Sequence, residues 1–178
     1  MWQSELMTVS ADRSTAPIEV SDLRRLAEIA AAVEADLFAR HPEGSGRSAG
    51  RLLCRALCQG AGLHYVDGQN GVKDFDVWSF YAERPDGPFP ARWSGTADFG
   101  PSKFGRSSGD LPTCQGRRVD LLGRSLPVPL EADSADVLRG YLSAARTASA
   151  KALAAKGVVP IDPAHRAGEI IWPATGGG

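Results

Sequence analysis

The sequence predicts an α+β domain (mixed α/β), in which a small mixed sheet carrying acidic residues is packed by N-terminal helices and one long C-terminal helix. Three observations predict this class. Apolar residues recur at helical spacing near both ends of the chain. Residues 73–82 (KDFDVWSFYA) are rich in aromatic and β-branched side chains, which is typical of a strand. The length of 178 residues suits one domain with its own core.

Two helices are expected in the N-terminal part, after a flexible leader at residues 1–20. Ser21 can cap a helix that extends to about Arg40. One face of this helix is apolar and consists of Leu23, Leu26, Ala27, Ala30, Val33 and Leu37. A second helix is expected over residues 48–59, with Leu52, Leu53, Ala56 and Leu57 facing inward, and Gly60 and Gly62 end it.

Three strands are expected in the middle of the chain. Residues 63–66 form the first strand, residues 67–71 (DGQNG) form a turn, and residues 73–82 form the second strand. Residues 83–115 are rich in Gly, Pro and Ser and show little periodicity. We expect a long excursion there, with short strand pieces such as residues 91–93 within it. Residues 116–122 (GRRVDLL) form the third strand.

The C-terminal part is expected to be one helix. Asp133 can cap a helix over residues 134–156, with a core stripe of Val137, Leu138, Tyr141, Leu142 and Ala145. Residues 158–159 and 169–172 would add an edge strand or a docked tail. The sequence therefore predicts a single domain over residues 21–173 and a disordered tail at residues 174–178.

The composition excludes several classes of protein. With 20 basic and 21 acidic residues, the net charge of -1 does not indicate a nucleic-acid partner or an anionic membrane surface. No apolar run approaches the roughly 20 residues that cross a bilayer, and residues 1–17 lack the apolar core of a signal peptide. We therefore expect a cytoplasmic protein. The 3 cysteines form neither a disulfide framework nor a zinc-ligand pattern, and we expect them to be buried.

The candidate site is a cluster of acidic residues. Asp74 and Asp76 project from the same face of one predicted strand, because strand side chains alternate. Asp120 lies on the next predicted strand, which can bring its carboxylate beside the pair. Carboxylates are the ligands that Mg²⁺ prefers, so Asp74, Asp76 and Asp120 are candidate metal ligands and catalytic residues.

A structural alternative is an acidic edge strand that discourages aggregation. Against it, Val72, Trp78 and Phe80 share the predicted face of the acids. A solvent face would not normally carry Trp and Phe, so we expect the acidic end of the strand to open into a cleft.

This order of motifs resembles the nucleotidyltransferase superfamily of the DNA polymerase beta type, over about residues 51–122. The matching segments are residues 71–77 (GVKDFDV) and residues 118–122 (RVDLL). In that family a glycine-serine turn after a strand precedes the Asp pair. Its counterpart here is Gly68-Gln69, which lies closer to the pair than in the family and has no serine.

The resemblance implies divalent-metal-dependent nucleotidyl or phosphoryl transfer, with Mg²⁺ as cofactor, a nucleoside triphosphate as substrate and an acceptor that the sequence does not name. It places Gly68, Gln69, Gly71 and Lys73 beside the nucleotide. Lys103 and Arg106, in the loop at residues 102–106, are candidate phosphate contacts if that loop faces the site; ordinary loop charge is the alternative.

Two other functions stay open at this point. A non-enzymatic binding or toxin–antitoxin-type interaction module would keep the fold without the chemistry. A metal-dependent nuclease would use the same carboxylates with Lys73 or Lys103. In such enzymes an acid and a lysine two apart usually follow the first Asp, and residues 83–85 (ERP) do not supply that pair.

Overall fold

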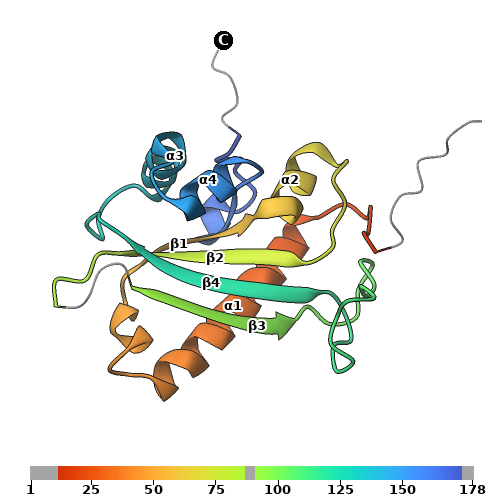
Figure 1. The fold of residues 1–178 in the computed structure, drawn as a ribbon, viewed down its shortest axis with the longest axis horizontal. Helices are drawn as coiled ribbons and strands as arrows, with labels where there is room; N and C mark the ends of the chain where they lie inside the picture. The colour runs from red at the N-terminus through yellow and green to blue at the C-terminus, as the bar shows by residue number, and fades with distance from the viewer. Residues whose placement is uncertain (1–11, 87–90, 174–178) are drawn as a thin grey trace, which may run out of the picture.

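The computed structural model describes residues 12–86 and 91–173, and these form a mixed sheet with helices on both faces. The sheet has the strand order β3-β4-β2-β1-β5 (Figure 1). Strands β2 and β4 are parallel, whereas the other neighbouring pairs are antiparallel. The strands are β1 Leu52–Cys58, β2 Phe75–Ala82, β3 Arg92–Asp98, β4 Arg118–Leu126 and β5 Val159–Asp162. This architecture confirms the predicted α+β class.

One face of the sheet is covered by helix α1, which comprises Val20–Arg40. Its buried residues Leu23, Leu26 and Ala30 pack against apolar side chains of the sheet. A capping box between Glu19 and Asp22 begins the helix, so the N-terminal cap is Glu19 rather than Ser21. The predicted helix over residues 21–40 is confirmed.

The sequence prediction for residues 48–67 is wrong, because helix and strand are exchanged. Residues 45–48 form a short 3-10 helix, β1 then occupies Leu52–Cys58, and helix α2 comprises Gln59–Asp67. Strand β1 is central and buried on both faces: Leu57 belongs to the core under α1, and Ala56 to the opposite core. A strand that is buried on both sides shows no polar alternation, and its apolar run therefore also fits a helical pattern.

The other face is covered by two helices, α3 at Ser134–Ala144 and α4 at Ala148–Ala154. The single long C-terminal helix predicted from the sequence is therefore wrong. Ala145 adopts a left-handed conformation with φ of 44°, which ends α3, and the Thr147 side chain caps α4 by accepting from the Ala150 N–H. The Asp133 cap of α3 is confirmed, since its carboxylate accepts from the Asp136 N–H at 3.0 Å.

The remaining strand predictions differ from the structure mainly in their bounds. Strand β2 begins two residues later than predicted, at Phe75, and β4 extends to Leu126 instead of ending at residue 122. The excursion at residues 83–115 contains a complete strand, β3. The C-terminal segment contributes β5 and an isolated bridge between Val158 and Trp172.

The two ends of the chain lie partly outside the described residues. This applies to residues 1–11 of the predicted leader and to the predicted tail at residues 174–178. Within the described part of the leader, Ser14 pairs with Val72 through two backbone hydrogen bonds of 2.9 and 2.7 Å, and Ile18 is buried. Across the described residues, no helix combines the length and apolar character needed to span a membrane.

Candidate functional site

The three predicted acids meet at one end of the sheet. Strands β2 and β4 are parallel and both begin at this end, beside α2 (Figure 1). Asp76 of β2 and Asp120 of β4 are direct partners in the register, and Asp74 lies just ahead of β2. The side chains of Trp78 and Phe80 lie in the core on the same face as Asp76, whereas Val72 belongs to the opposite core. The expectation that Val72 shares this face is wrong, because the strand begins only at Phe75.

Arg118 links two of the acids. Its Nη2 lies 2.9 Å from Oδ2 of Asp120 and 3.6 Å from Oδ2 of Asp74. The Nε of the same guanidinium donates to Asp120 at 3.1 Å. The charges of Asp74 and Asp120 are therefore partly neutralised within the chain.

Asp76 is the carboxyl that this arginine does not pair with. Burial raises its pKa to about 6, and the charges of Asp74 and Asp120 add to the rise, while Lys156 and Arg118 oppose it. Within residues 12–86 and 91–173, no side chain lies at ion-pair or hydrogen-bond distance from the Asp76 carboxyl. Asp76 is thus able to hold or accept a proton near neutral pH.

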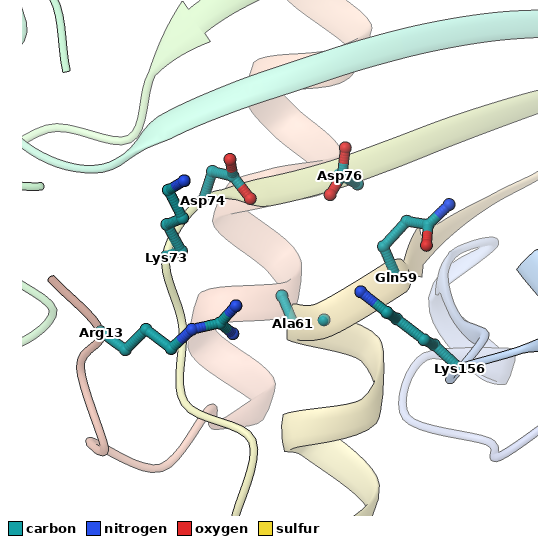
Figure 2. A pocket seen from close by; sticks show the side chains of 8 residues that line it. Arg13, Gln59, Ala61, Lys73, Asp74, Asp76 and Lys156 are labelled. Atoms are coloured by element: carbon teal, nitrogen blue, oxygen red, sulfur yellow. The ribbon is translucent and has the colours of Figure 1, made fainter. Parts of the chain in front are cut away.

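A cavity of about 210 Å³ opens in front of Asp74 and Asp76 (Figure 2). Its lining also includes the turn from β1 into α2 and three basic side chains; the residues are Arg13, Gln59, Gly60, Ala61, Lys73, Asp74, Asp76 and Lys156. Figure 2 shows Arg13 and Lys156 pointing into the space below the acids from opposite sides. The cavity therefore joins carboxylates and cations from three separate segments of the chain, and residues 59–61 are a fourth, uncharged segment of its lining.

The basic side chains of this cavity have no ion-pair partner in the described part of the chain. Arg13 donates only to the backbone carbonyl of Asn70, at 3.3 Å. The side chains of Lys73 and Lys156 make no hydrogen bond or ion pair there, although Lys156 acts on Asp76 and Lys73 acts on Asp12 through their charges. Three uncommitted cations around a concave space are suited to binding the oxygens of an anionic ligand.

The first turn of α2, which directly follows β1, places Gln59 and Gly60 in the cavity. Gln59 has φ of 56°, a conformation that non-glycine residues rarely adopt and that turns the chain sharply from strand to helix. Farther along α2, Gly62 packs directly on Gly157, so that the neighbouring Lys156 is brought to the cavity. The sequence pattern does not indicate Arg13, Gln59, Gly60 and Lys156 as site residues. Arg13 falls in the expected leader, residues 48–59 fit a helix that Gly60 ends, and residue 156 falls at the end of another expected helix.

The glycine turn predicted to grip phosphate does not line this cavity. Gly68 is the left-handed C-cap of α2, with φ of 67°, and Asp67 accepts from the Gln69 N–H at 2.8 Å. The Gly71 N–H donates to Nδ1 of the buried His64 at 2.9 Å. Gly68, Gln69 and Gly71 thus close the C-terminal end of α2, because that segment is a helix and not the predicted strand.

Of the basic residues predicted to contact phosphate, Lys73 lines the cavity and the other two do not. Lys103 pairs with Glu19 at 2.8 Å and with Asp22 at 3.1 Å, at the N-terminus of α1. Arg106 is exposed and donates to the Leu111 carbonyl at 3.3 Å. The loop at residues 102–106 therefore holds α1 instead of facing the acids.

Two of the three cysteines, Cys54 and Cys58, are poorly suited to act as nucleophiles at neutral pH. Cys54 and Cys58 are buried in the core under α3 and α4. Burial raises the pKa of Cys54 to about 12 and that of Cys58 well above its ordinary value. Their thiolate forms are therefore scarce, and the thiolate is the reactive species.

A preformed three-carboxylate metal centre does not fit this arrangement. Within the described residues, no group of three His, Cys, Asp or Glu side chains is placed to hold a metal ion. The Arg118 guanidinium lies between Asp74 and Asp120 and would have to move before both could bind one cation. Asp74 and Asp76 remain the two carboxylates that face the cavity.

Comparisons with protein-family models, curated proteins and solved structures found no match. The resemblance to nucleotidyltransferases therefore stays a prediction that rests on this chain alone. Along the chain, β1 is followed directly by α2, which begins with Gln59-Gly60, and then by β2, which carries Asp76. Strand β3 comes next, followed by β4, which is parallel to β2 and carries Asp120.

Proposed function

We propose that this chain binds a nucleoside triphosphate in the cavity of Asp74 and Asp76 and transfers a nucleotidyl or phosphoryl group from it. The observation that carries the proposal is the combination of two carboxylates with three uncommitted cations, Arg13, Lys73 and Lys156, in one concave space. Phosphate oxygens supply the anionic partner that these cations lack. A cation bound to the triphosphate would find oxygen ligands in the facing carboxylates.

The turn between β1 and α2 supports the same proposal. Gly60 lies at the start of α2 and lines the cavity together with Gln59 and Ala61. A glycine-containing turn between a strand and a helix lets backbone N–H groups approach phosphate closely. In the resemblance described above, the turn that precedes the Asp pair thus corresponds to Gln59-Gly60 instead of Gly68-Gln69.

The residues of the cavity have separate roles in this proposal. Arg13, Lys73 and Lys156 bind and orient the phosphates, and Asp74 faces the cation that accompanies the triphosphate. Asp76, with a pKa raised to about 6 by burial, accepts the proton of the attacking acceptor hydroxyl. Transfer then forms a new oxygen–phosphorus bond to the acceptor and releases pyrophosphate, or the nucleoside diphosphate if the terminal group is transferred.

A second candidate function is favoured by the ion pairs of Arg118. This arginine already partly neutralises Asp74 and Asp120, so these two carboxylates have a positive partner without a metal ion or substrate. The chain would then be a non-catalytic binding or toxin–antitoxin-type interaction module that keeps the fold.

Calorimetric titration separates the two candidates. Wild type, Lys156→Gln and Asp76→Asn are titrated with ATP in the presence of Mg²⁺, and Lys103→Gln serves as the matched control, since Lys103 lies outside the cavity. The proposal predicts ATP binding that is weakened about tenfold or more by Lys156→Gln and unchanged by Lys103→Gln. Product analysis after incubation distinguishes transfer from nucleic-acid cleavage. Absence of ATP binding by folded wild type would contradict the proposal and favour the interaction module.

A further inference from the structure

A second and larger cavity lies against α3 at the C-terminal end of β4, which is the end away from the acids. Its volume is about 510 Å³. The lining comes from the C-terminal end of β4, the segment after it, α3 and the connection from α3 to α4. The proposed nucleotide cavity shares no residue with it.

Arg124 is an unpartnered charge in the wall of this cavity. It is only 7% exposed, and its guanidinium carbon lies 5.9 Å from the centroid of the Tyr141 ring. Apart from this ring contact, the Arg124 guanidinium makes no hydrogen bond or ion pair with any residue that the structure describes. A nearly buried guanidinium without an anion is energetically unfavourable, and an anion bound in the cavity would supply the missing negative partner.

The surrounding charges increase this need for an anion. Arg146 lines the cavity together with Arg124. Arg92 lies directly opposite Arg124 in the β3–β4 register, outside the lining of the cavity. Asp136 is an acid in the lining, but its side chain is 81% exposed and its carboxylate lies 3.6 Å from Arg139. The charged side chains that line the cavity therefore carry a net positive charge, and Arg124 is the buried one among them.

The rest of the lining is mainly apolar. Leu126 is buried, and Val128, Val137 and the Tyr141 ring are partly buried around the cavity. A simple inorganic anion would leave this surface in water, whereas a purely apolar ligand would leave Arg124 without a partner. The complementary ligand has one anionic group and an apolar body.

We propose that this cavity binds an amphipathic carboxylate whose carboxyl group pairs with Arg124 and whose apolar body packs against α3. The planar guanidinium matches a carboxylate through two parallel hydrogen bonds. Arg124 lies on the same sheet face as Asp120, about 13 Å farther along β4 at about 3.3 Å per residue. The site is therefore separate from the nucleotide cavity and does not depend on the function proposed above.

Gly140 offers a way to block the cavity without disturbing the fold. It lies within α3 and lines the cavity, and a Cβ built on it meets no heavy atom within 4 Å. Alanine is a better helix former than glycine, and leucine is nearly as good. Gly140→Leu would therefore place an apolar side chain at the cavity, while Gly140→Ala controls for the change in helix propensity.

Binding is measured by calorimetry with octanoate and phenylacetate as carboxylate probes and octan-1-ol as the neutral counterpart, at constant ionic strength. We expect saturable binding of at least one carboxylate to wild type and weaker binding of octan-1-ol. Arg124→Gln should weaken carboxylate binding about tenfold or more. Gly140→Leu should weaken it as well, whereas Gly140→Ala and Arg40→Gln, on the opposite face of the sheet, should leave it unchanged.

Three outcomes would overturn the proposal: no saturable binding of either carboxylate to folded wild type, equal affinity of wild type and Gly140→Leu, or equal affinity of wild type and folded Arg124→Gln. Circular dichroism checks that each variant is folded. If Arg124→Gln does not fold, the comparison of Gly140→Leu with Gly140→Ala still tests the site.

Discussion

Gly62 of α2 and Gly157, just ahead of β5, contact each other through their backbones. A Cβ on Gly62 would lie 2.4 Å from the Gly157 carbonyl oxygen, and a Cβ on Gly157 would lie 2.5 Å from the Gly62 carbonyl carbon. No other amino acid fits at either position without moving the backbone. The contact holds the start of α2 against the segment that carries Lys156, and thereby assembles one side of the Asp76 cavity.

Gly157→Ala should lower the free energy of unfolding by about 1–3 kcal/mol, which is typical of an overpacked site. The added methyl group displaces α2 from the segment of Lys156, so the affinity of the cavity for ATP should fall as well. Chemical denaturation and calorimetry measure the two effects. Gly140→Ala is the control, since its Cβ has open space, and it should stabilise the protein by about 1 kcal/mol. Unchanged stability of Gly157→Ala would show that the contact is not tight.

Asp76→Asn should stabilise the protein at pH 7.5 by up to about 3 kcal/mol. This is the free energy that corresponds to the rise of the Asp76 pKa from its ordinary value of 3.8 to about 6 in the folded protein. The folded state holds the Asp76 proton more tightly than the unfolded chain does. The stability of wild type therefore falls as the pH rises from about 4 to above 6, and Asp76→Asn lacks this fall.

Denaturation curves between pH 3.5 and 8, recorded without added metal ions, measure this difference. The stabilisation by Asp76→Asn should disappear at the acidic end of the range. Asp36→Asn, at an exposed ion pair of α1, should show little change across it. A variant Asp76→Asn that is less stable than wild type at pH 7.5 would instead indicate a structural role for the carboxylate.

Arg118→Gln tests whether the acidic cluster can bind a cation. Removing this guanidinium leaves Asp74 and Asp120 without their shared partner. The local negative charge rises, and the affinity for Mn²⁺ should increase about tenfold relative to wild type. Calorimetry with Mn²⁺ measures the change, and Arg40→Gln is the control because Arg40 pairs with Asp36 on α1. Equal Mn²⁺ affinity in the two variants would argue against a cation site at these carboxylates.

Arg55→Met should destabilise the protein by about 3 kcal/mol, because it leaves the largely buried carboxylate of Glu34 without its partner. Arg55 is 5% exposed and pairs with Glu34 of α1 at 2.8 Å and with Asp162 of β5. Tyr81 also donates to Glu34, so this group joins α1 to the sheet. Urea denaturation gives the loss, and the double variant Glu34→Leu/Arg55→Met should recover part of it. No recovery would show that the packing of Arg55, not the unpaired Glu34, sets the cost.

Local patterns determined several parts of the fold and of the candidate site. The apolar face of α1 has helical periodicity because the helix is buried on one side only, and α1 is found where Leu23, Leu26 and Ala30 predict it. Strand alternation placed Asp76 on the face of Trp78, and the β2–β4 register places Asp120 beside it. These relationships depend on neighbours in the chain and on the elementary geometry of strands.

Only the tertiary structure decided the rest. Strand β1 is buried on both faces, so its sequence carries no period that separates strand from helix. The break between α3 and α4 depends on one left-handed residue, Ala145, whose conformation its side chain does not favour. Lys103 lies beside Glu19 and Lys156 near Asp76 because contacts between distant segments place them there. Local periodicity predicts single elements, whereas the partners of a side chain depend on the close packing of segments that are far apart in the sequence.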